Sequence, residues 1–545
     1  MNQYLSRLTF LKKEPIIVFF FLAIILALNA IGLYHKQFTY DEGRHYEFGT
    51  KMLELKSDRY DDSKMPVSAL NAMPLKIWTM IEPYKWSQPF RSLRKMQRAR
   101  FVTTLFSVLL ATFVFRWAKA LYGITAGFIS LTLYSFSPNI LAHSRLITTD
   151  LFGACMTTIA LYSYWRFIKA GRWGRALGSA FVLGLCQLTK YSCVFLYPIF
   201  LLIAIAIYSP VVLELIRKRS YLLLLRNAGR FFATAVLFII ISLIPINLGF
   251  YCNKSFTKLS QYTFKSDFFT RLQPKILQIA DFPVPTPVPY LEGLDWVKYH
   301  DETGKGFGNV YLFETLRKGK GFIGYYFFAW LYKVPLTAQL FFILALLTFF
   351  RKKSQRCSIQ DELFILIPVV FFFIYLNFFF QAQMGIRLFL AVIPLVHVFC
   401  GRLFINWPNF RPAAKNLTIG LLVFYIVSTL SYTPHFLSYF NELVLDRKFT
   451  YRILGDSNID WGENQWYLEQ YVKKHPESIV TPPAPIAGRV IVTINDLTGV
   501  NEDPNKYRWL RENFKPVDHV AYSYLVYQVS GDQLQRIINN YKTAK

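Results

Sequence analysis

Charged residues and cysteine are both scarce in this sequence of 545 residues. Only 17% of the residues are Asp, Glu, Lys or Arg, whereas 53% are hydrophobic. Intrinsic disorder is excluded, because disordered chains lack apolar residues. Six cysteines in this length, with no CxxC pair, predict neither a disulfide framework nor a zinc site.

Acidic residues are the rarer charged class. The sequence has 33 Asp and Glu against 61 Lys and Arg, which gives a formal net charge of +28. A soluble protein this basic would usually be rich in charge and suited to nucleic acid. This chain is basic and apolar together, with 18% aromatic residues, and that combination indicates a membrane protein without a nucleic-acid partner.

Long apolar runs recur along most of the chain. A membrane span needs about 20 mostly apolar residues. Runs of this kind begin near Ile16, Phe101, Ile124, Leu151, Ala176, Cys193, Phe231, Leu336, Leu363, Leu388 and Leu417. We therefore expect a polytopic α-helical membrane protein with about eleven transmembrane helices. The overlong run 176–208 is divided at Thr189-Lys190-Tyr191, because a lysine in mid-membrane would be costly.

Lys and Arg are concentrated in every second connection between these runs. Cytoplasmic loops carry an excess of Lys and Arg, which places the N-terminus in the cytoplasm. Connections assigned to that side contain, among others, Lys13, Arg116, Lys119, Arg166, Lys169, Arg172, Arg175, Arg217, Lys218, Arg219, Arg226, Arg230, Arg402, Arg411 and Lys415. The short turns on the opposite side hold only Arg145, Lys190 and Arg387. We expect a multi-pass protein of the cell inner (plasma) membrane.

Three large segments then lie on the extracytoplasmic side. Two are outer loops, at about 36–100 and 252–335, within a transmembrane module that covers 1–433. The third is the tail, 434–545. In the tail, Arg489–Ile494 and Ala521–Val529 have strand patterns, and Pro504–Phe514 has a helical one. A small C-terminal α/β domain is therefore predicted.

An acidic pair follows the first span directly. Asp41 and His45 are spaced i,i+4 and Glu42 and His45 i,i+3, so on a short helix they share a face. Carboxylates at a membrane surface can act as a general base or bind a metal. The alternative interpretation is a solvated loop helix with a charged cap.

A second carboxylate, Asp150, ends an outer turn that also contains His143 and Arg145. The alternative role for Asp150 is that of a helix N-cap. Lys190 and Arg387 lie in other outer turns, and two cations beside carboxylates predict a phosphate site next to a base. The alternative for either cation alone is snorkelling at a helix end.

Spacing alone does not separate an enzyme from a transporter or flippase of lipid-linked sugars or another anionic solute. Transporter sites lie near the bilayer midplane, whereas these charges cluster at one face. The large outer segments also favour an enzyme.

Several motifs, taken in order, resemble those of GT-C glycosyltransferases, and more narrowly the protein-mannosyltransferase and aminoarabinose-transferase group. They are the acidic pair, the turn that ends in Asp150, Leu188-Thr-Lys-Tyr191, Gln383-Met-Gly-Ile-Arg387 with Pro394, Pro434–Glu442 and Gly455–Gly462. The chain departs from this group at Lys64-Met65-Pro66, where such proteins often have a His-Pro-Pro-like run.

The resemblance implies an inverting transferase that uses a polyprenyl-phosphate-linked sugar on the outer side of the membrane. Its acceptor would be a lipid, glycan or protein. By this resemblance Asp41 is the base and belongs with Glu42 and Asp150 to a catalytic set, while His45 and His143 orient the acceptor or the base. Lys190, Arg387 and Arg145 would bind the donor phosphate. No cofactor is obligatory, and a divalent cation on Asp41, Glu42 and His45 stays open. The segment Asp456–Trp461 is interpreted as a turn and helix cap rather than as part of the catalytic set.

Overall fold

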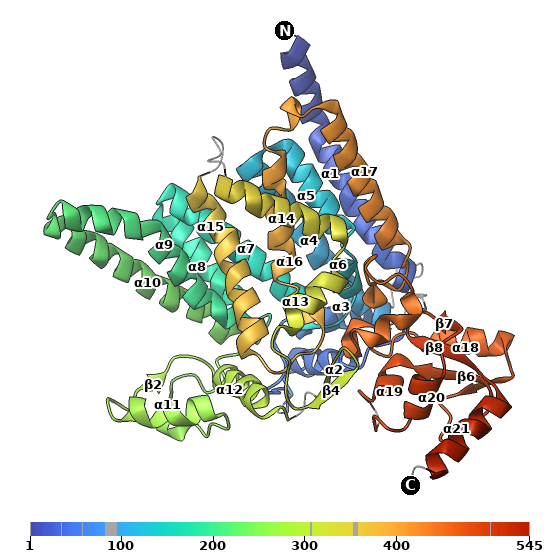
Figure 1. Cartoon of the computed structure of the whole chain (residues 1–545). Coiled ribbons are helices and arrows are strands. Elements are labelled where there is room, and N and C mark those ends of the chain that lie inside the picture. Colours follow the sequence, from blue (N-terminus) through green and yellow to red (C-terminus); the bar gives the residue numbers. More distant parts are fainter. Residues whose placement is uncertain are drawn as a thin grey trace.

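The computed structural model describes residues 2–33, 35–56, 58–81, 95–305, 308–351, 358–501 and 503–543. It shows a bundle of long helices with the N-terminus at one end (Figure 1). The two outer loops and the C-terminal domain gather at the opposite end of the bundle (Figure 1).

Every predicted apolar run forms a helix. The helices of the bundle are α1 Asn2–Leu33, α4 Lys95–Tyr122, α5 Ile124–Ser135, α7 Thr149–Ala170, α8 Trp173–Gln187, α9 Leu196–Arg217, α10 Tyr221–Gly249, α13 Tyr325–Lys333, α14 Leu336–Arg351, α15 Ile359–Ile374, α16 Val392–Cys400 and α17 Pro412–Leu430. Within the described residues, six helices are long and apolar enough to cross a membrane. The pair α13 and α14, bent by 117°, would make a seventh. The predicted polytopic helical class is confirmed, but the number of about eleven spans is not.

The predicted break inside the run 176–208 is confirmed. Helix α8 ends at Gln187, a 3-10 turn (η2) covers Tyr191–Phe195, and α9 begins at Leu196. Lys190 therefore lies at the junction between two helices and not in the middle of one.

The outer loops fold into helices and short antiparallel strand pairs. The first loop forms α2 Glu42–Leu53 and α3 Ser68–Ile81, and the turn between α5 and α7 forms α6 Pro138–His143. The loop 252–335 adds β1 Thr257–Lys258, α11 Asp267–Leu277, β2 Pro283–Val284, α12 Val288–Thr303, β3 Asn309–Leu312 and β4 Thr315–Lys318.

The tail contains the predicted α/β domain. Its elements are α18 Gln465–Lys474, β5 Ser478–Val480, β6 Gly488–Thr493, α19 Ile494–Thr498, α20 Arg508–Asn513, β7 Asp518–Val520, β8 Tyr524–Val529 and α21 Gly531–Thr543. The sheet has the order β5-β6-β8-β7, with β5 and β6 parallel and the other pairs antiparallel. Helix α20 is shorter than predicted, because a turn closed by the Lys506 N–H and the Asp503 carbonyl precedes it.

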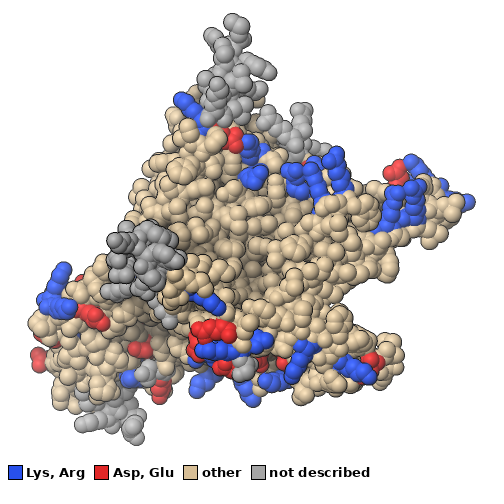
Figure 2. Space-filling view, turned by 180° about the vertical axis from the view of Figure 1, so that it is seen from behind, with Lys and Arg blue, Asp and Glu red and all other residues tan. Residues whose placement is uncertain are grey.

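The surface carries its charges in two separate zones. Figure 2 shows mainly Lys and Arg, with a few Asp and Glu, at the N-terminal end, mixed Lys, Arg, Asp and Glu at the opposite end, and a largely uncharged belt between them. Such a belt is the surface that a bilayer requires. The predicted orientation in the membrane remains a prediction.

Candidate active site

One large cavity, of about 1390 Å³, opens at the end of the bundle where the outer loops and the tail meet. Four predicted site residues that are far apart in sequence line it together: Asp41, Asp150, Lys190 and Arg387. His45 lines the cavity as well. The structure thus brings together most of the charges that the sequence had placed on one side of the membrane.

Arg387 pairs directly with Asp41. Its Nη1 donates to Asp41 Oδ2 at 3.0 Å and lies 4.0 Å from Asp150 Oδ2. Asp41 precedes α2 at the cap position, but its side chain caps no backbone group of the helix. The carboxylate therefore faces the cavity cation, and the solvated-cap interpretation is wrong.

Asp150 pairs with the other predicted cation. Lys190 Nζ lies 2.5 Å from Asp150 Oδ1, and the Asp150 side chain is only 5% exposed. The cap residue of α7 is Thr148, so Asp150 lies in the first turn and its carboxylate serves the ion pair. Lys190 is directed into the cavity rather than along the bundle surface, so snorkelling does not describe it.

Glu42 points away from the cavity, although the sequence placed it in the catalytic set. Its side chain is fully buried, and Oε1 accepts from Arg100 Nε at 2.7 Å. The same carboxylate accepts from the Thr39 and Ile147 backbone N–H groups at 2.8 and 2.9 Å. Glu42 therefore fixes the segment around Asp41 to α4 and to the turn before α7.

Arg145 and His143 are also outside the lining of the cavity. Arg145 Nη2 donates to the Pro434 carbonyl at 2.6 Å, and its side chain packs beside Gly32. His143 is buried, with its ring 6.3 Å from that of Trp461. Neither side chain lines the cavity, and the roles predicted for them toward the donor phosphate and the acceptor stay predictions.

His45 and Lys64 form the wall beside Asp41. His45 Nδ1 lies 3.2 Å from Ser68 Oγ, and burial, followed by the charge of Lys64, lowers the pKa of His45 to about 4. The ring is consequently neutral at pH 7. Burial also lowers the pKa of Lys64. Lys64 stands where the resemblance predicted a different motif, and only the structure shows that it lines the cavity.

The metal site considered for Asp41, Glu42 and His45 is not formed. Among the described parts of the chain, no three or more His, Cys, Asp or Glu side chains are grouped so that they could hold a metal ion. Glu42 is engaged with Arg100, which separates it from the other two side chains.

The tail contributes residues that were not included in the predicted catalytic set. Asp456, Asp460 and Trp461 all line the cavity, and the Trp461 ring lies under the Arg387 guanidinium at 4.2 Å. Burial raises the pKa of Asp456, and burial together with Glu463 raises that of Asp460 to about 7. The segment forms the predicted turn at Asp456–Asn458, but the cap position of α18 is Asn464, and the side chains of Asp456, Asp460 and Trp461 line the cavity.

The lining of the cavity includes both apolar and polar groups. The apolar ones come from η2, from the last turns of α15 and from the π-helical turn η4 Tyr375–Phe379 with the residue after it, namely Phe195, Phe372, Tyr375, Leu376, Phe379 and Phe380. Polar groups of the C-terminal domain also line the cavity, including Gln465, Thr493, Asn495 and Tyr524. The paired charges of Asp41, Asp150, Lys190 and Arg387 belong to the same lining.

A family model of dolichyl-phosphate-mannose-protein mannosyltransferases matches residues 92–240. This segment contains Asp150 and Lys190. The predicted resemblance to GT-C glycosyltransferases is confirmed. The match covers the GT-C-like helices from the start of α4 to α10, and it does not extend to Asp41, Arg387 or the tail.

Solved structures of GT-C enzymes resemble the chain at low identity. ArnT from Cupriavidus metallidurans bound to undecaprenyl phosphate has 12% identity and a TM-score of 0.46, over 95% of this chain and 98% of ArnT. The oligosaccharyltransferase from Archaeoglobus fulgidus has 12% identity and a TM-score of 0.46, over 77% of this chain and 54% of its own. No curated protein sequence matches the chain.

Removing the charge of Glu42 is expected to destabilise the fold. Glu42→Gln leaves the Arg100 charge buried without its partner, and breaking such a pair costs about 3–5 kcal/mol. Thermal unfolding in detergent measures the effect. Glu47→Gln is the matched control, because Glu47 lies on the same helix with its side chain 68% exposed, and we expect a change within about 0.5 kcal/mol. Equal stability of both variants would contradict the assigned role of Glu42.

Proposed function

We propose that the protein is an integral-membrane, inverting glycosyltransferase that moves a sugar from a polyprenyl-phosphate donor to an envelope acceptor on the extracytoplasmic side. One observation carries this proposal: two cations, Arg387 and Lys190, and two carboxylates, Asp41 and Asp150, meet in a single cavity. Cations stabilise a leaving phosphate, and a carboxylate accepts the proton of an attacking hydroxyl group.

The reaction needs one bond made and one broken. The acceptor hydroxyl oxygen attacks the anomeric carbon, and the bond from that carbon to the phosphate oxygen breaks with its electron pair on the phosphate. The hydroxyl proton passes to Asp41. Attack from the face opposite the leaving group inverts the configuration of the anomeric carbon. Arg387 and Lys190 neutralise the departing phosphate, so no acid is needed on the leaving group.

In the structure the cations and carboxylates of the site are paired with one another. A phosphate that enters between them competes for Arg387 and Lys190, since both cations bind phosphate oxygens as well as carboxylates. Partial release of Asp41 from Arg387 makes its oxygen available to the acceptor hydroxyl group. Donor binding and base activation are thus two effects of the same exchange of partners.

The apolar and polar parts of the cavity lining fit the two substrates. A polyprenyl chain matches the aromatic residues Phe195, Phe372 and Phe379. A hydroxyl-bearing acceptor, whether lipid, glycan or protein, matches the polar groups of the C-terminal domain.

No cofactor is required in this scheme, because the protein's own cations neutralise the phosphate. We therefore expect sugar transfer to continue undiminished in EDTA. If EDTA abolished transfer and a divalent cation restored it, this scheme would be wrong.

Mass spectrometry of envelope glycolipids and glycoproteins tests the proposal. We expect a product that is heavier by one sugar residue in cells that contain the gene and that is absent from cells without it. A transporter would move its substrate across the membrane without forming a glycosidic bond. If the substrate crossed the membrane and no product of higher mass appeared, the protein would be a transporter and the proposed transferase function would be wrong.

A further inference from the structure

Arg387 and the turn before it are contacted by a segment of the tail, residues 455–463, that lies about seventy positions further along the chain. We propose that Trp461 is a positioning residue for Arg387, and that this tail segment presents the guanidinium to an anionic phosphate in the cavity. The inference rests on the proposed function and extends it to the C-terminal part of the chain.

The backbone before Arg387 is held by two tail side chains. Ser457 Oγ donates to the Met384 carbonyl at 3.2 Å, and Asn458 Oδ1 accepts from the Ile386 N–H at 3.0 Å. Gly385, between them, has φ +69°, and a Cβ there would lie 2.7 Å from Ser457 Oγ. The tail therefore packs so closely on this turn that only glycine fits at position 385.

The guanidinium itself is fixed on three sides. Arg387 Nε donates to the Met384 carbonyl at 3.1 Å, and Nη1 donates to Asp41. The Trp461 indole covers one face at 4.2 Å. Indole is the aromatic ring that attracts a cation most strongly, and the attraction grows where water is excluded. Trp461 is 8% exposed, so it meets this condition.

Trp461 is held in turn by the segment that precedes Asp41. The Trp461 carbonyl accepts from the Tyr40 N–H at 3.1 Å, and the Glu463 carbonyl accepts from the Gln37 N–H at 3.0 Å. The Trp461 N–H donates to Glu463 Oε2 at 3.0 Å. The two segments thus run side by side, and the residue next to Asp41 is bonded to the residue that covers Arg387.

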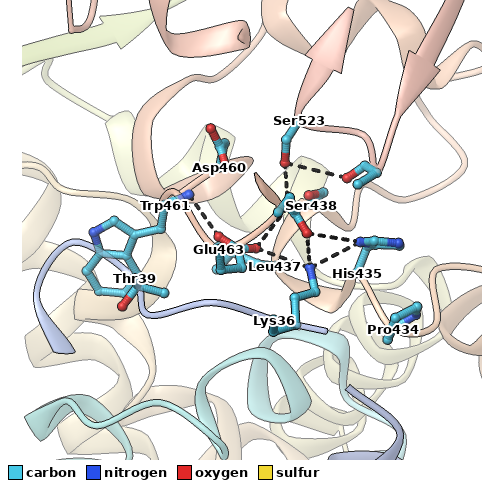
Figure 3. A network of polar contacts seen from close by, with 12 residues as sticks. Lys36, Thr39, Pro434, His435, Leu437, Ser438, Asp460, Trp461, Glu463 and Ser523 are labelled. Atoms are coloured by element: carbon cyan, nitrogen blue, oxygen red, sulfur yellow. Dashed lines mark hydrogen bonds and ion pairs between the residues drawn. The ribbon is translucent and has the colours of Figure 1, made fainter. Parts of the chain in front are cut away.

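A buried ionic network locks this pairing (Figure 3). Lys36 Nζ lies 3.4 Å from Glu463 Oε1 and 3.1 Å from His435 Nδ1, and it also donates to Asn464. Lys36 is 1% exposed, and burial lowers its pKa to about 8. Buried ion pairs contribute little to stability but can specify one arrangement of segments, and here that arrangement sets Trp461 against Arg387.

Binding of undecaprenyl phosphate and of undecaprenol to the full-length protein in nanodiscs tests the inference. Undecaprenol has the same chain without the phosphate. Trp461→Leu removes the π face, and we expect it to weaken undecaprenyl phosphate binding about tenfold and to leave undecaprenol binding unchanged. Trp461→Phe retains an aromatic face and is expected to recover most of the affinity. Trp509→Leu is the matched control, a buried tryptophan of the same domain outside the cavity lining, and should not change either affinity.

The outcomes separate the two proposals. If wild-type protein prefers undecaprenyl phosphate and Trp461→Leu keeps that preference, the positioning role is wrong and the proposed function stands. If Trp461→Leu weakens both lipids equally, its role is structural and the inference is again overturned. If the wild-type protein does not distinguish the two lipids, the donor-phosphate site itself is wrong, and the inference falls with it.

Discussion

Replacing Asp41 by Asn is expected to lower sugar transfer by about 10²–10⁴-fold, while the protein still folds and inserts. Asn has nearly the same size, and its amide oxygen can still accept from Arg387 Nη1. It cannot take the proton of the acceptor hydroxyl group at neutral pH. The loss is therefore chemical, and donor binding should change far less than turnover.

Yield of the glycosylated product, compared at equal amounts of membrane-inserted protein, measures this effect. Asp58→Asn is the matched control, because Asp58 belongs to the same outer loop and its side chain is 65% exposed. The control is expected to transfer sugar at the wild-type rate. Full activity of Asp41→Asn would remove Asp41 from the reaction.

Replacing Arg387 by Met should lower transfer by about 10²–10³-fold, because a cation that meets the developing phosphate charge is lost. Arg387→Lys keeps the charge but loses the planar fork and much of the contact with Trp461, so only partial activity is expected. Undecaprenyl phosphate binding should weaken in both variants, and more in Arg387→Met.

Arg447→Met provides the matched control for Arg387. Arg447 also stacks on an aromatic ring, with its guanidinium 4.0 Å from the centre of the Tyr432 ring, but it is not among the cavity-lining residues. Its replacement should leave lipid-phosphate binding unchanged. Wild-type binding and transfer by Arg387→Met would show that the phosphate is bound elsewhere.

The part of the site that sequence could predict is the part governed by membrane topology. Asp41, Asp150, Lys190 and Arg387 occur in turns that the positive-inside rule places on one side, and the ends of packed helices bring such turns together. Charged residues close to the ends of apolar runs are uncommon on that side, and this indicated a functional site. The structure places all four residues in one cavity.

The errors arose where a contact joins segments that are distant in sequence. Helical spacing predicted that Glu42 shares a face with His45, but the Glu42 side chain is turned away from the cavity by its pairing with Arg100, on a helix beyond the whole first loop. The segment Asp456–Trp461 has the local signature of a turn, and it forms one. Its role depends on the contact between Trp461 and Arg387, which no local pattern contains.

The close pairing of residues 36–40 with 461–463 has a consequence for recombining this chain with its relatives. A chimera joined at position 434 would exchange Trp461 and Glu463 together with the sheet, and so would separate the new tail from the old Tyr40 and Lys36. A chimera joined after Gln465 would retain these partners and exchange only the sheet and its helices. The C-terminal sheet is therefore most safely exchanged at the second joint, because that joint keeps Trp461 and Glu463 with the segment 36–40 that they contact.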